Sequence, residues 1–166
     1  DPFLRVRMRA ELRRLQKRLG IPFVHVTHGQ DEALALADLV VVMNKGRIEQ
    51  AGAPREVFER PATEFVARFL GGHNVIPTPN GAVAVRADRM QLLPAVAPRS
   101  GARMTAVVRG VEYQGSQYQI ALEGAGLTDL SAIVGDADFA AKPLAVGCEV
   151  GLTWAEADIH PLSPAL

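Results

Sequence analysis

One histidine of this sequence has both the chemistry and the position of a ligand-contacting residue. His28 directly follows residues 23–27, a nearly continuous apolar run that is typical of a strand buried on both faces of a parallel sheet. Asp31 and Glu32 come next and suit the negative first turn of a short helix through Ala37. Ligands of open α/β sheets bind at the carboxyl ends of strands, where His28 is expected. The alternative is a loop histidine that only bonds a nearby carbonyl group.

The other residues with ligating or nucleophilic side chains do not form a pattern. Cys148 is the only cysteine, so the sequence excludes a disulfide framework and a cysteine-based zinc site, and it fits a reducing compartment. His73 and His160 are too far apart in the sequence to propose as a metal pair, and His25 is expected to pack inside its strand. We predict no metal site.

Helical and strand patterns alternate through the first part of the chain. Residues 3–19 place leucines and a methionine at helical spacing, with arginines on the other faces, and Gly20 ends this helix. Residues 39–43 predict a second buried strand, and Gly46 allows a tight hairpin to follow it. Two short helices are expected at residues 54–60 and 63–70. This order predicts the tail end of an α/β domain.

Composition places the chain among ordinary globular proteins and divides it in two. Its 166 residues are 48% hydrophobic and 22% charged, which excludes collagen-like and disordered classes. No apolar run approaches the roughly 18 residues of a membrane span. Residues 1–74 carry 12 basic and 9 acidic side chains, whereas residues 75–166 carry 6 and 9. Most of the glycines and prolines also follow position 74, so we predict a linker at residues 71–74.

The second part of the chain has the pattern of a small all-β domain. Apolar and polar residues alternate over short segments that are separated by glycine and proline. The expected strands are residues 82–86, 90–93, 104–113, 117–122, 130–134 and 149–154. Short strands in this arrangement predict a small antiparallel barrel or sandwich.

The first part closely resembles the ATP-binding subunits of ABC importers. The similarity runs in one register from Asp1 through the segment that contains His28 and the hairpin, and on to Ala67. It covers essentially all of residues 1–74. The resemblance implies the C-terminal part of a P-loop ATPase domain with an α/β fold.

The resemblance also implies roles for two residues. Asp1 matches the D-loop aspartate that faces the other subunit across the nucleotide, and His28 matches the switch histidine that contacts the γ-phosphate. An imidazole N–H aimed at the γ-phosphoryl oxygens suits phosphoryl transfer, which is catalysed mainly by positioning and hydrogen-bond donors. The family usually has aspartate after this histidine, whereas Gly29 stands here, so we expect an altered turn.

Several family motifs are missing from these 166 residues. There is no G-x-x-x-x-G-K-[ST] loop to cradle phosphates, no L-S-G-G-Q signature, no Q-loop and no Walker B Asp-Glu pair. In the family these motifs lie upstream of the position that matches Asp1. We therefore expect the parent protein to hydrolyse ATP with Mg²⁺, and this fragment alone to be inactive and to bind neither.

The second part resembles the TOBE domain, an OB-like regulatory module. Residues 85–88, 107–116 and 147–154 carry this similarity, and residues 154–162 resemble the spermidine/putrescine branch of a group that also imports iron, sulfate and maltose. The expected domains are therefore the nucleotide-binding part at residues 1–74 and a TOBE domain at residues 75–166.

The resemblance implies partners and a location. Family members form homodimers, bind membrane permease subunits and work indirectly with a solute-binding protein, as peripheral proteins on the cytoplasmic face of the bacterial inner membrane. The alternative is a stand-alone TOBE-type module that binds an oxyanion or another small solute. We predict no nucleic-acid binding, because the second part is net negative and the arginines of the first helix suit a solvated face.

Overall fold

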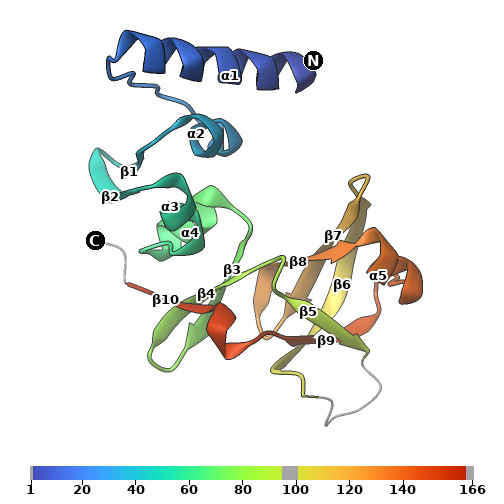
Figure 1. Cartoon of the computed structure of the whole chain (residues 1–166). Helices are drawn as coiled ribbons and strands as arrows, with labels where there is room; N and C mark the ends of the chain where they lie inside the picture. Colours follow the sequence, from blue (N-terminus) through green and yellow to red (C-terminus); the bar gives the residue numbers. More distant parts are fainter. Residues whose placement is uncertain (1, 95–100, 164–166) are drawn as a thin grey trace. The chain divides into compact units, whose positions relative to one another are not determined.

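The computed structural model describes residues 2–94 and 101–163 of the chain (Figure 1). They form two compact units, of which the first ends at Arg60 and the second begins at Pro61. No helix among the described residues combines the length and the apolar character needed to cross a membrane.

The first unit contains helices and one β-hairpin. Its elements are α1 (Pro2–Leu19), α2 (Gln30–Leu36), β1 (Val40–Asn44), β2 (Arg47–Gly52) and α3 (Pro54–Glu59). The predicted end of the first helix is confirmed, because Gly20 has a φ of 65° and its N–H donates to the Gln16 carbonyl at 3.0 Å. This is a conformation that glycine adopts without steric cost.

The apolar run before His28 is not a strand, and that prediction is wrong. Residues 21–29 form neither helix nor strand, and no described strand pairs with them. Val24 and Val26 are 92% and 88% exposed, so the run is also not buried. A parallel strand requires neighbours that share its hydrogen bonds, and the described part of this unit offers only a hairpin that pairs with itself. A parallel α/β sheet is therefore not present in the described residues.

The predicted hairpin is confirmed. β1 and β2 pair antiparallel around Lys45 and Gly46, whose φ values are 48° and 80°. Positive φ at both central residues is the geometry that favours a two-residue hairpin turn. Val40 and Val42 are buried, but Val41 between them is 44% exposed. The strand is thus buried on one face, whereas the sequence predicted burial on both.

The second unit is built mainly from strands, as predicted. Its helices are α4 (Glu64–Leu70) and α5 (Asp136–Ala141), with a 3₁₀ turn at Glu156–Asp158. Its strands are β3 (His73–Thr78), β4 (Gly81–Arg86), β5 (Gln91–Pro94), β6 (Met104–Tyr113), β7 (Gln117–Gly124), β8 (Leu127–Gly135), β9 (Glu149–Thr153) and β10 (Ile159–Leu162). One sheet has the order β10-β4-β3 and the other the order β5-β9-β6-β7-β8, with antiparallel pairs throughout.

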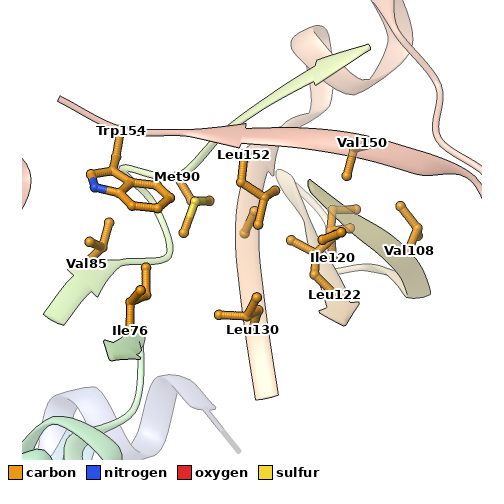
Figure 2. Close-up of a cluster of buried hydrophobic side chains, with 12 residues drawn as sticks. Ile76, Val85, Met90, Val108, Ile120, Leu122, Leu130, Val150, Leu152 and Trp154 are labelled. Carbon is orange, nitrogen blue, oxygen red and sulfur yellow. The ribbon is translucent and has the colours of Figure 1, made fainter. Parts of the chain in front are cut away.

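Side chains from both sheets form one hydrophobic core. Figure 2 shows Val150 and Leu152 of β9 above Ile120 and Leu122 of β7, with Trp154 beside Met90. The alternation of buried and exposed residues along β6 and β7 is what a sheet with one face on the core requires. The predicted strand at residues 104–113 coincides with β6.

The segment predicted as a linker instead enters the core of the second unit. Gly71 and Gly72 have φ values near 70°, but His73 and Asn74 already belong to β3. Asn74 is fully buried, and its amide contacts backbone groups of both β4 and β8. The compact units divide ten residues earlier, at Pro61.

Candidate functional site

A hydrogen-bonded turn carries His28 into helix α2. The Thr27 hydroxyl accepts a bond from the Gly29 N–H at 2.9 Å and donates one to Glu32 Oε2 at 2.8 Å. The Gly29 carbonyl accepts from the Ala33 N–H at 3.1 Å, which begins the helix. The turn is therefore tied to α2 although Gly29, the residue before the helix, has no side chain to cap it.

His28 lies at an open groove between α1 and the start of α2. Leu4, Arg5, Met8, Arg9 and Leu12 line the α1 side, and residues 29–32 line the other. The imidazole is exposed, and the groove holds two arginines as well as the carboxylates of Asp31 and Glu32. An exposed imidazole N–H can donate a hydrogen bond to an anionic group such as a phosphate.

The Glu32 carboxylate contacts two side chains that precede α2, Thr27 and His25. The Thr27 hydroxyl bond lowers the pKa of Glu32, and His25, whose Nε2 lies 3.4 Å from Oε2, lowers it further. Both contacts favour the ionised carboxylate. The sequence predicts that His25 packs inside a strand, but its side chain is 54% exposed.

The structure places His28 but does not test the role expected of Asp1, because Asp1 lies outside the described residues. Sequence reasoning missed Thr27, Glu32, Arg5 and Arg9 as neighbours of the histidine. The spacing of Thr27 five residues before a glutamate in a first helical turn was the signal that could have found the first two.

The described residues contain no group of three or more His, Cys, Asp or Glu arranged to hold a metal ion. None of them is therefore assigned to Mg²⁺. Cys148 is half-buried and forms no disulfide. His73 is held in the second unit, with Nδ1 2.9 Å from the Gly71 carbonyl oxygen.

Comparison with known proteins finds a domain match in the second unit and relatives whose similarity spans both units. Residues 83–162 match the TOBE domain family. A spermidine/putrescine import ATP-binding protein PotA from Bacillus thuringiensis is 34% identical over 155 residues, which cover 93% of this chain and 47% of that protein. The chain thus spans about half the length of this relative.

Two other relatives match shorter stretches at higher identity. PotA from Acidothermus cellulolyticus is 47% identical over 66% of this chain and 30% of its own length. The sn-glycerol-3-phosphate import ATP-binding protein UgpC from Chromohalobacter salexigens is 51% identical over 61% of this chain and 29% of its own. The structure of a cytoplasmic molybdate-binding protein, ModG, aligns with 48% of the chain and 61% of its own at 20% identity and a TM-score of 0.41, a level that assigns neither fold nor ligand.

Proposed function

We propose that this chain is the C-terminal portion of an ATP-binding subunit of an ABC importer with a TOBE domain. In this proposal residues 1–74 are the last part of the nucleotide-binding domain and residues 75–166 are the TOBE domain. The observation that carries it is the match to an import ATP-binding protein along 93% of the chain, through both units.

Exposed apolar side chains of the first unit support an incomplete ATPase domain. The α1 residues Leu4, Met8 and Leu12 are 58%, 53% and 42% exposed, and Val24 and Val26 are almost fully exposed. A folded domain buries such residues against neighbouring elements. We propose that the upstream strands and helices of a P-loop ATPase domain cover them, and that residues 23–27 then pair as a strand.

His28 is proposed to contact the γ-phosphate of ATP. Its imidazole is exposed, and the Thr27 hydroxyl ties its turn to the start of α2, so an anionic ligand can approach it. Its N–H would stabilise charge on the phosphoryl oxygens and would lose its partner once the phosphate departs. Asp1 is proposed to face the second subunit across the same nucleotide.

ATP and Mg²⁺ are proposed as substrate and cofactor of the whole protein. The Mg²⁺ ion would neutralise phosphate charge, and its ligands would come from residues outside this chain. Without a phosphate-cradling loop the 166 residues alone are expected to be inactive.

The proposed cellular role is ATP-driven import of a small solute. The match that spans most of the chain is to a spermidine/putrescine import protein, which favours a polyamine, whereas the UgpC match favours a phosphate ester. The subunit would form a homodimer, bind membrane permease subunits at the cytoplasmic face of the bacterial inner membrane, and act indirectly with a solute-binding protein. A stand-alone TOBE module would not explain why residues outside 83–162 also match an import ATP-binding protein.

Turnover of the full-length protein tests this proposal. His28→Ala is expected to lower the rate of ATP hydrolysis about 100-fold or more, since loss of one such catalytic contact costs about 10²–10³. His160→Ala, in the second unit, is the matched control and should retain activity. A His28→Ala protein with wild-type turnover would contradict the proposal.

A further inference from the structure

We propose that Thr27 is a positioning residue for His28, because its hydroxyl fastens the backbone on both sides of the histidine to helix α2. This inference rests on the γ-phosphate contact proposed for His28. Nothing in it requires Thr27 to touch the nucleotide.

The contacts of the Thr27 hydroxyl surround His28 in the sequence. Thr27 precedes the histidine, and Gly29, whose N–H donates to the hydroxyl at 2.9 Å, follows it. One side chain thus closes a short loop with His28 at its tip. A closed loop restricts the backbone dihedral angles that set the direction of the His28 side chain.

Glu32 anchors this loop to a regular element. Its Oε2 accepts from the Thr27 hydroxyl at 2.8 Å and lies 3.4 Å from His25 Nε2. Glu32 is in the first turn of α2, whose backbone bond from Ala33 to Gly29 fixes the helix start. The His28 loop is therefore held from the helix side as well.

Gly29 explains why the hydroxyl matters in this chain. Gly29 is the residue before α2 and has no side chain to bond the helix N–H groups or its own loop. A Cβ at Gly29 would lie 3.4 Å from Thr27 Oγ1 and 3.6 Å from Glu32 Cβ, an ordinary contact distance. A Cβ would thus fit beside the Thr27–Glu32 pair without displacing it, and in this chain that pair is what fixes the turn.

The competing explanation is that the Thr27–Glu32 bond only stabilises α2. In that case its removal would lower stability without changing how the protein distinguishes nucleotides. A positioning role instead affects the contact that His28 makes, and that contact exists with a γ-phosphate and not with ADP. The ratio of the dissociation constants for ADP and for a non-hydrolysable ATP analogue therefore separates the two.

The test uses the full-length protein with Thr27→Val, which removes the hydroxyl at nearly constant volume. We expect binding of the ATP analogue AMP-PNP to weaken about three- to tenfold, the effect of one lost hydrogen bond, with ADP binding unchanged. Thr27→Ser keeps the hydroxyl and should retain the wild-type ratio. If the valine variant does not fold, Glu32→Ala replaces it, with Glu11→Ala on exposed α1 as its control.

His28→Ala makes the outcomes distinguishable. If His28→Ala leaves the nucleotide ratio unchanged, the proposed γ-phosphate contact is wrong. If His28→Ala changes the ratio and Thr27→Val does not, the contact stands and the positioning role is wrong. If both change it and the double variant is no worse than His28→Ala, Thr27 acts through His28.

Discussion

Asn74 and Ser131 exchange hydrogen bonds in both directions within the second unit. The Asn74 amide donates to the Ser131 carbonyl at 2.9 Å, and the Ser131 N–H donates to Asn74 Oδ1 at 2.7 Å. Asn74 is fully buried in β3, whereas Ser131 lies in β8 of the other sheet. This pair therefore joins the two sheets through backbone groups that would otherwise lack partners.

Replacing Asn74 by alanine is expected to destabilise the second unit by about 2–3 kcal/mol. The change removes the Asn74 side-chain amide that bonds the Ser131 N–H and C=O, and leaving a buried polar group without a partner costs about 1–3 kcal/mol. Trp154 is the only tryptophan and lies in this core, so its fluorescence during urea unfolding measures the effect. Gln119→Ala, which changes an exposed side chain, is the control and should alter the free energy of unfolding by no more than about 0.5 kcal/mol. Equal stabilities of the two variants would contradict the bridging role.

Gly124 at the end of β7 is expected to tolerate no side chain. A Cβ there would lie 2.2 Å from the Thr105 carbonyl oxygen and 2.8 Å from Ala106 Cα, both of which are backbone atoms. Gly124→Ala should therefore destabilise the unit by about 2–3 kcal/mol, as for overpacking in a core. Gly110→Ala meets only the Ala121 side chain at 3.4 Å and serves as the control. The same Trp154 unfolding experiment compares them, and a neutral Gly124→Ala would disprove the close approach.

The sequence revealed elements whose signal is local. The hairpin at Lys45 and Gly46 follows from turn residues between apolar segments, and β6 follows from alternation over ten residues. The helix predicted at residues 63–70 is α4, and the Thr63 hydroxyl caps it by accepting from the Val66 N–H at 3.3 Å. Each of these patterns is complete within a few neighbouring residues.

The errors have a different origin. Residues 23–27 have the composition of a buried strand, but whether a strand forms depends on distant segments that pair with it. Residues 73–78 contain polar residues and a proline, which masked β3, because Asn74 is buried by partners far along the chain. The sequence placed His28 at a possible site, but the Thr27–Glu32 bond that holds its turn depends on side-chain geometry.

The pKa of Glu32 should depend on Thr27. The Thr27 bond and the nearby His25 hold the pKa of Glu32 in the folded protein below its ordinary value. The ionised carboxylate therefore contributes its full stabilisation at pH values above its unfolded-state pKa. It is lost as the pH falls through the lowered folded-state pKa, below the ordinary glutamate value of about 4.3. A carbon-detected NMR titration of the Glu32 carboxyl should show a higher pKa in Thr27→Val. An unchanged pKa would show that this bond does not form.

The 166-residue chain by itself is expected to dimerise or aggregate. Val24 and Val26 are 92% and 88% exposed in a segment that pairs with no strand in the described part of the chain, and exposed apolar segments of this kind associate. Light scattering should show particles larger than a monomer, and Val24→Asp should shift them toward monomer. A strictly monomeric wild-type chain would contradict this expectation.

The measurement that tests the central claim most directly is the sequence of the reading frame upstream of Asp1. If the chain is part of an importer ATPase subunit, the upstream sequence will contain a G-x-x-x-x-G-K-[ST] loop and a strand that ends in an Asp-Glu pair. A start codon immediately before Asp1 would contradict the account. The chain would then be a regulator with a TOBE domain, and His28 an ordinary loop histidine.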